Sequence, residues 1–227
     1  MKTTILSLLI VVMAFIGAKA QTNTETRTLN AFDQLDVSDA IEVELQKGEK
    51  QEITITASGI GLDQIVSSVD KRRLELEVDG SKPKSSAVKV VVTYVQLNEI
   101  EVSSGAKVFV KDLIENKDID LTVASNGYLE IEVKAENLML EAETNARMFV
   151  KGTAVNLDYN AFTNAEIDGE ELVVEHAEIR TNTNASGVFE VTESLKGTAA
   201  TRGRVNYKGE PKIIDVKESI GGAIEKL

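Results

Sequence analysis

Hydrophobic and polar residues alternate with a period of two over most of the chain before residue 97. Val, Ile and Leu occupy every second position of these segments, and mainly Glu, Thr or Lys fill the positions between them. This period is typical of strands that bury one face and expose the other to water. Strands are therefore predicted at 41–45, 53–56, 74–78 and 88–95.

Two N-terminal segments depart from this alternation. Residues 21–28 consist of Gln, Thr, Asn, Glu and Arg and have no periodic apolar face. We expect a flexible leader there. Within 60–69, Leu62, Ile65 and Val66 follow the spacing of a helix face, which predicts the one short helix of the chain.

Beyond residue 97, a short motif of small and polar residues recurs between the alternating segments. Its middle positions are 105, 126, 145, 164, 184, 202 and 221, so the successive intervals are 21, 19, 19, 20, 18 and 19. Such a nearly fixed period indicates an internal repeat. The copies of the motif are Ser104-Gly105-Ala106, Ser125-Asn126-Gly127, Thr144-Asn145-Ala146, Thr163-Asn164-Ala165, Thr183-Asn184-Ala185, Thr201-Arg202-Gly203 and Ile220-Gly221-Gly222.

A repeat of about 19–21 residues is too short for a pair of helices and suits one coil of a β-solenoid. One coil cannot bury its own apolar row, so stacked coils share a continuous core with strands about 4.8 Å apart. We therefore predict an all-β fold, a right-handed parallel β-helix or β-solenoid. Residues 29–97 form the strands that start the stack, 98–227 form the repeat coils, and together they make a single domain, 29–227.

The repeated motif suits a tight corner, because Gly and Asn accept a positive φ and small residues let neighbouring coils approach closely. Four of the corners centre on an asparagine. These side chains are expected either to stack as an amide ladder that satisfies the turning backbone or to form a polar row for a ligand. The four residues are Asn126, Asn145, Asn164 and Asn184.

Three segments, together with the corners, resemble a known family. They are FDQLDVSDAIEV at 32–43, QLNEIEVSSGA at 96–106 and YKGEPK at 207–212. The pattern resembles the head GIN domain family, described as putative auto-transporter adhesins, over residues 28–227. The resemblance implies an exported bacterial protein with a β-helical fold, and it brings no catalytic residues to this chain.

Residues 1–20 have the organisation of a secretory signal peptide. Lys2 is followed by an apolar run at 5–16 and by the small residues of Ala18-Lys19-Ala20. The run is shorter than the roughly 20 residues that cross a bilayer as a helix. We expect cleavage before Gln21, no membrane span after cleavage, and a location in the periplasm, at the cell surface or outside the cell.

Composition excludes several classes of protein. The chain has 25 basic and 37 acidic residues, a net charge of −12, and neither cysteine nor tryptophan. Without cysteine it has no disulfide, thiolate zinc site or cysteine nucleophile. The excess of acidic residues argues against a nucleic acid as partner.

Recognisable catalytic groups are absent from the sequence. His176 is the only histidine, and its surroundings predict a strand position, so a zinc site with two histidines is excluded. No catalytic residue, cofactor-binding residue or metal ligand is assigned, and no cofactor is expected. We expect a protein that is not an enzyme.

Acidic residues nevertheless leave an enzymatic alternative open. A hydrolase or lyase for polysaccharides uses carboxylates that gather in space, and either three or more clustered carboxylates or a cleft that pairs carboxylates with arginine would favour it. Solvated strand faces are the more common explanation of such residues. The candidates are Asp112, Asp118, Asp120, Asp158 and Asp168, with Arg147, Arg180, Arg202 and Arg204.

Three aromatic residues follow the repeat. Phe109, Tyr128 and Phe149 recur at intervals of 19 and 21. Packing in the core or across strands is the usual role of such residues. If they share an outward face, they form a row that is the best candidate for a contact surface.

These observations predict an exported, non-enzymatic β-solenoid that acts as an adhesin or as an envelope-associated binding module. Its expected partner is a glycan or a surface protein. Two alternatives remain: a polysaccharide-active enzyme on the same scaffold, and a structural envelope protein that self-associates through its terminal coils. The sequence leaves the oligomeric state open.

Overall fold

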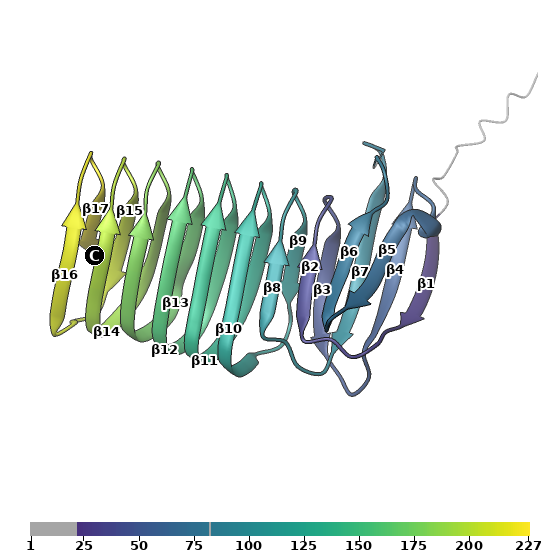
Figure 1. Ribbon diagram of the computed structural model, residues 1–227, viewed down its shortest axis with the longest axis horizontal. Coiled ribbons are helices and arrows are strands. Elements are labelled where there is room, and N and C mark those ends of the chain that lie inside the picture. Colours follow the sequence, from purple (N-terminus) through teal and green to yellow (C-terminus); the bar gives the residue numbers. More distant parts are fainter. Residues whose placement is uncertain (1–21, 82) are drawn as a thin grey trace, which may run out of the picture.

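The computed structural model describes residues 22–81 and 83–227, and the predicted signal peptide at 1–20 lies outside this range. The described residues form a solenoid of about seven turns in which nearly all regular structure is β. In Figure 1 the chain ascends in the near strands, crosses at the top, descends in the far strands and advances by one coil per circuit. This sense of winding is right-handed, so the predicted fold is confirmed.

The repeat coils contain two parallel sheets that face each other. The longest strands run down the far sheet, bend, and return up the near sheet (Figure 1). Successive coils pair in parallel one repeat apart, as in Tyr128 with Arg147 and Leu138 with Leu157. The strands of this part are β8 (Glu99–Val102), β9 (Lys107–Val110), β10 (Ile114–Ala124), β11 (Tyr128–Glu143), β12 (Arg147–Phe162), β13 (Glu166–Thr181), β14 (Ser186–Ala199), β15 (Arg204–Lys208), β16 (Ile213–Glu218) and β17 (Ala223–Lys226).

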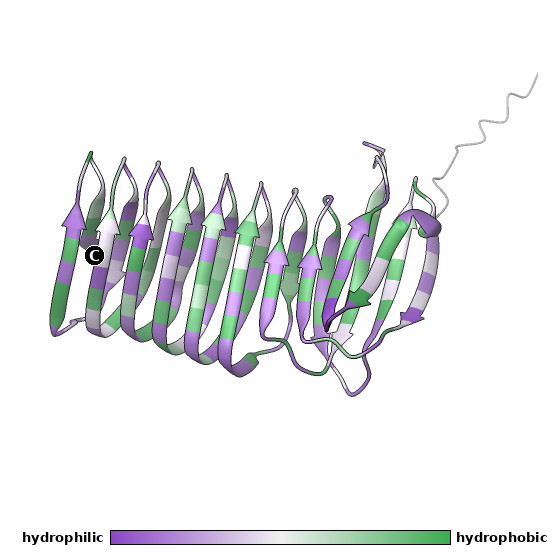
Figure 2. Ribbon diagram, in the orientation of Figure 1, coloured by the Kyte–Doolittle hydropathy of each residue, from purple (hydrophilic) through white to green (hydrophobic). Residues whose placement is uncertain are grey.

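Rows of aligned apolar side chains fill the space between the two sheets. One row follows the register through Leu121, Leu140, Tyr159 and Ile179, all of which are fully buried. Figure 2 shows the resulting alternation of hydrophobic and hydrophilic positions along the strands. Burying one such side chain contributes roughly 1.5–3 kcal/mol to the stability of the fold. Stacking therefore stabilises coils that would leave their apolar side chains in water if they were isolated.

The predicted corners are confirmed, and each is a tight turn at the top of a coil. Two successive residues have positive φ, for example 56° at Thr144 and 60° at Asn145, the conformation of a type I′ turn. Each corner of the repeat before the last one also bonds to the next coil. The Asn126 N–H donates to the Thr144 carbonyl at 3.0 Å, and the Asn145 N–H to the Thr163 carbonyl at 3.0 Å.

The N-terminal strands form the first coils and a cap. β2 pairs in parallel with β6 on one side and β8 on the other, and β3 lies between β7 and β9 in the same way. The coil of β6 and β7 therefore lies outside the coil of β2 and β3, although it comes later in the sequence. The strands of this part are β1 (Thr22–Thr28), β2 (Gln34–Val37), β3 (Glu42–Lys47), β4 (Glu52–Ser58), β5 (Ile65–Asp70), β6 (Arg73–Val78) and β7 (Ala87–Tyr94).

The prediction of a flexible leader at 21–28 is wrong for its described residues, because Thr22–Thr28 form strand β1. This strand pairs antiparallel with β4 and covers that edge of the sheet. Facing threonines, Thr26 and Thr54, have hydroxyl oxygens 3.1 Å apart. An edge strand of this kind needs backbone partners and no apolar face, so a search for apolar periodicity misses it.

The predicted helix within 60–69 is also wrong. Only a 3₁₀ turn, η1 (Leu62–Gln64), forms there, and β5 follows at once. The β-branched residues Ile65, Val66 and Val69 favour a strand. β5 forms an antiparallel hairpin with β6, and this pairing outweighs the helical spacing.

Candidate functional site

Three aromatic rings form a row on the outer surface of the far sheet. Phe109 on β9, Tyr128 on β11 and Phe149 on β12 are each half-buried. The ring centroids of neighbouring members lie 5.4 Å apart in both pairs. The outward row that the sequence spacing suggested is therefore present.

The row is a zigzag and includes charged neighbours. Phe109 and Phe149 are both in register with Glu130, whereas Tyr128 is in register with Lys107 and Arg147. The exposed Glu130 thus lies between the two phenylalanines, and a basic residue flanks the tyrosine on either side. Aromatic faces beside hydrogen-bonding groups are the usual components of a ligand site.

Tyr128 and Glu130 are linked within the row. The Tyr128 hydroxyl donates to Glu130 Oε2 at 3.4 Å. Partial burial raises the pKa of Tyr128, and the charge of Glu130 adds to this effect. The phenol therefore keeps its proton and can donate a hydrogen bond at neutral pH.

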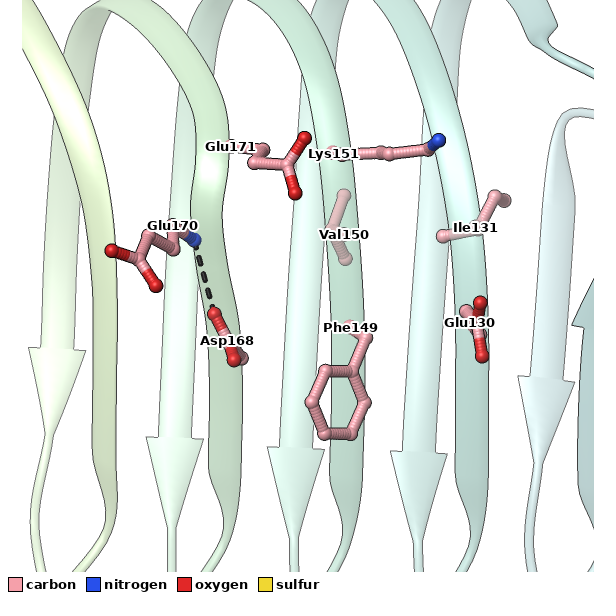
Figure 3. Close-up of a pocket in the computed structure, with 8 residues that line it drawn as sticks. All are labelled: Glu130, Ile131, Phe149, Val150, Lys151, Asp168, Glu170 and Glu171. Atoms are coloured by element: carbon pink, nitrogen blue, oxygen red, sulfur yellow. Dashed lines mark hydrogen bonds between the residues drawn. The ribbon is translucent and has the colours of Figure 1, made fainter.

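A hollow of about 380 Å³ lies beside the ring of Phe149. It follows from a β-bulge, because the register between β12 and β13 shifts between Phe149 and Gly152. The extra residue lies in the segment 169–171 and bends the strand outward, as bulges do. Figure 3 shows Glu130, Ile131, Phe149, Val150, Lys151, Asp168, Glu170 and Glu171 around the hollow.

The hollow carries a net negative charge. Four of its lining residues are carboxylates, and Lys151 is the one base among them. The Glu170 N–H donates to Asp168 Oδ1 at 3.1 Å, as Figure 3 shows. The Lys208 ammonium lies 2.8 Å from Glu170 and lowers the pKa of that exposed carboxyl. This charge disfavours an acidic ligand.

The structure brings together three of the five aspartates named above. Asp118, Asp120 and Asp158 line a second, broader hollow on the near sheet, of about 870 Å³. Asp168 lies on the other face beside Phe149, and Asp112 accepts a hydrogen bond from the Lys47 N–H at 2.7 Å elsewhere.

Two of these three carboxylates already have hydrogen-bond partners. Asp118 Oδ1 accepts from Asn137 Nδ2 at 2.6 Å, and Asp158 Oδ1 accepts from Asn160 Nδ2 at 2.9 Å. Partial burial raises the pKa of Asp120, and the charge of Asp118 raises it further. The Asp120 carboxyl therefore keeps its proton to a higher pH than an ordinary aspartate does.

The predicted strand position of His176 is confirmed. It is exposed on β13, and its Nδ1 lies 2.9 Å from Ser194 Oγ. Within 22–81 and 83–227, no group of three or more His, Asp or Glu residues is placed to hold a metal ion. Over the same residues no helix is long and apolar enough to span a membrane.

The arginines named as candidates mostly pair with acids on strand faces. Arg180 contacts Asp158 at 3.2 Å beside the second hollow, and Arg147 lies 3.6 Å from Glu166. Arg204 is an exposed residue at the start of β15, and Arg202 occupies a corner with φ 62°.

The corner asparagines form a partial amide ladder. Asn164 Nδ2 donates to Asn145 Oδ1 at 3.4 Å, and Asn184 Nδ2 donates to Asn164 Oδ1 at 3.1 Å. These side chains are exposed, and they bond to one another. Their backbone N–H groups make the bonds between coils.

Comparison with protein families gives one match, which covers residues 31–211. Its description is putative auto-transporter adhesin, head GIN domain. This chain belongs to that family. No curated protein matches the chain.

Solved structures share the fold of this head GIN domain protein. A putative adhesin from Parabacteroides merdae aligns with a TM-score of 0.75 at 19% identity, over 91% of this chain and 96% of that one. A putative adhesin from Bacteroides fragilis gives 0.67 at 19% identity, over 91% and 97%. A putative lipid binding protein from Parabacteroides distasonis gives 0.69 at 17% identity, over 91% and 96%. At these identities the similarity concerns the fold.

Sequence reasoning missed the bulge of this head GIN domain and the hollow that it opens. One signal was available, since the interval from Asn164 to Asn184 is one position longer than the interval from Asn145 to Asn164. The additional residue lies in the coil that contains the bulge. Its position within the coil, beside Phe149, follows only from the register of the two strands.

Proposed function

We propose that this chain is an exported, non-enzymatic adhesin or envelope-associated binding module that holds a glycan against its aromatic row. The aromatic row consists of Phe109, Tyr128 and Phe149. The observation that carries the proposal is three partly exposed rings, with neighbouring centroids 5.4 Å apart, on the outer surface of the far sheet. Partly exposed aromatic side chains that gather in one place favour a contact role.

The geometry suits a linear sugar chain. The rings advance by one coil at a time, and strands in a sheet are about 4.8 Å apart, a distance comparable with one sugar ring. Sugar rings stack their apolar faces on aromatic side chains, and Glu130, Lys151 and Asp168 offer hydrogen bonds at the edge. The net charge of −12 and the carboxylates of the hollow favour a glycan without acidic groups.

The test is a glycan array probed with the protein lacking residues 1–20, scored for both retention and degradation of each glycan. We expect retention of linear neutral or amino-sugar glycans, without cleavage. The double variant Phe109→Ala/Phe149→Ala should weaken retention about tenfold or more, because two stacked rings are lost. Tyr128→Phe keeps the row and should have a smaller effect.

Phe162→Ala is the matched control. Phe162 is also half-buried, but it lies at the end of β12 on the near sheet, away from the row. This variant should bind like the unaltered protein. If the double variant and the control bind equally well, the aromatic row is not the binding surface. If the protein binds a surface protein selectively and no glycan, the partner is that protein and the glycan proposal is wrong.

A polysaccharide-active enzyme remains the second candidate, because Asp118, Asp120 and Asp158 line one hollow and the pKa of Asp120 is raised. Cleavage of a glycan on the array would favour this candidate. Asp120→Asn should then abolish the cleavage while leaving retention by the aromatic row intact. Cleavage that persists in Asp120→Asn would exclude this residue as the acid.

A further inference from the structure

The two ends of the solenoid differ in how they are closed. At the N-terminal end, β1 covers β4 and β5 covers β6, and among the described residues from 22 to 97 the one large apolar side chain that is exposed is Val95, at 46%. At the other end, β16 pairs only with β14, and β17 only with β15. In the described chain the outer edges of these two strands have no strand partner.

The last coil also leaves apolar side chains in water. Ile213, Ile214, Ile220 and Leu227 are 51–77% exposed. Ile214 is in register with Leu195, which is fully buried, so Ile214 continues a core row that nothing covers. An unpaired edge combined with exposed apolar residues is a template for adding another strand.

The charge pattern on the outward face of β16 is complementary to itself in the antiparallel direction. Asp215 and Lys217 are in register with the outward-facing residues Lys196 and Thr198, so both face outward. If two copies of β16 pair antiparallel about Val216, each Asp215 lies opposite Lys217 of the second copy. Opposite charges across a strand pair stabilise it, and like charges destabilise it.

We propose that a second copy of this chain docks on the C-terminal coil, edge to edge through β16, to form a two-fold dimer. A two-fold axis through Val216 also sets β17 beside β17 of the second copy, so both sheets continue from one copy to the other. The contact is closed because the same surface is used on both sides. The polar cap strand β1, with its exposed threonines and Glu25, offers no apolar row for a head-to-tail contact.

The oligomeric state tests this proposal, and the result does not depend on the ligand of the aromatic row. Sedimentation equilibrium of the protein lacking residues 1–20 should give twice the monomer mass, with dissociation on dilution. Asp215→Lys and Lys217→Asp each create like charges opposite one another. Each should raise the dimer dissociation constant about tenfold or more.

Mixing the variants provides the sharpest test. Asp215→Lys and Lys217→Asp are complementary to each other, so an equimolar mixture should recover the dimer. The charge swap that combines both substitutions in one chain should recover it too. Glu49→Lys, at an exposed turn near the opposite end, is the control and should leave the mass unchanged.

Three outcomes would overturn the proposal. The protein could remain a monomer at every concentration, Asp215→Lys could leave the dimer unaltered, or the mixture of variants could fail to associate. Because Asp215 and Lys217 point into solvent in the single chain, the variants should keep the circular dichroism and melting temperature of the parent.

Discussion

Threonine residues adopt an unusual backbone conformation at the corners of this solenoid. Thr144, Thr163 and Thr183 have φ between 50° and 56°, although β-branched residues rarely enter this region. Their carbonyls accept the backbone bonds from the preceding coil. The repeated backbone bond between coils therefore offsets local strain that one isolated turn would not tolerate.

The middle corner residue offers a direct test of this balance. Asn145→Val should lower the free energy of unfolding by about 1–2 kcal/mol, because a β-branched residue is strained at a φ of 60°. Asn145→Gly loses the amide contact with Asn164 but relieves the backbone, so its change should be smaller. Urea denaturation of both variants gives the comparison.

The exposure of the ladder decides how this result is interpreted. The Asn145 amide bonds to another exposed amide at 3.4 Å and caps no buried backbone group. If Asn145→Gly is as destabilising as Asn145→Val, then the side-chain ladder stabilises the corner and backbone strain does not. Equal stability of all three proteins would show that neither effect is significant.

A second residue-scale prediction concerns Asp36 on the near sheet. Burial raises its pKa, and repulsion from Glu101, which is in register with it, raises it further. A carboxyl whose pKa is raised in the folded state stabilises the fold while it is protonated. This stabilisation is fully present below pH 3.8, the ordinary pKa of an aspartate, and it is lost as the pH rises through the higher pKa of the folded state. Asp36→Asn should therefore melt at a higher temperature than the parent at about pH 7, and the difference should vanish toward about pH 3.

Thermal melts of both proteins across this pH range check the sign. Glu42→Gln is a suitable control, because Glu42 forms an exposed ion pair with Lys89 and such pairs contribute little. A stability difference for Asp36→Asn that grows toward acid pH would contradict the raised pKa.

At the scale of elements, one arginine fastens the N-terminal cap. Arg27 on β1 donates to the carbonyls of Ile65 and Leu62 at 2.8 Å each, and to Ser67 Oγ at 2.7 Å. These bonds connect β1 to η1 and β5, although β1 forms no strand pairing with either of them. The strand that the sequence suggested was a mobile leader is thus held by backbone pairing on one side and by this side chain on the other.

Arg27→Ala should lower the free energy of unfolding by about 1.5–3 kcal/mol, because hydrogen bonds from a charged group are lost at a partly buried site. Hydrogen exchange should become faster at the amides of β1 and β5 while the repeat coils stay protected. Arg72→Ala serves as the control, since its ion pair with Asp33 is more exposed. Uniform loss of protection throughout the molecule would contradict the assignment of Arg27 to the cap.

The elements differ in how far the sequence predicts them. The period of two and the spacing of the corners depend on side-chain burial in every coil, so the strands of the repeat and their turns follow from them. Strand β1 lacks an apolar face, and β5 carries a spacing that fits a helix. Both strands are held by backbone hydrogen bonds to another strand, β1 to β4 and β5 to β6. The spacing of apolar residues within a segment gives no information about such pairing.

At the scale of the whole molecule, the repeat predicts a stack but not its order. The coil of β6 and β7 precedes the coil of β2 and β3 along the axis. The sequence does not predict this order, because identical strand spacings leave both orders equally compatible with the periodicity. The aromatic row illustrates the same limit at the candidate site. Its existence follows from the nearly regular spacing of the three rings along the sequence, whereas the zigzag around Glu130 requires the register of three strands.

The proposed dimer also affects binding at this scale. A two-fold axis perpendicular to the flat faces leaves both aromatic rows on the same side of the assembly. Two rows that engage one surface or one long glycan bind with an effective concentration set by their fixed separation. Weak single contacts then give firm attachment.

The strands lie across the long axis of the solenoid (Figure 1) and pair from coil to coil, so the hydrogen bonds between coils run roughly along this axis. This gives the molecule a directional mechanical strength. A pull along the axis opens the boundary between two coils as a zipper opens, with few bonds under load at any moment. A pull along the strands loads a whole row of bonds in shear and meets greater resistance. If the aromatic row binds as proposed, attachment by this flat side is therefore best suited to drag that acts across the axis, parallel to the strands.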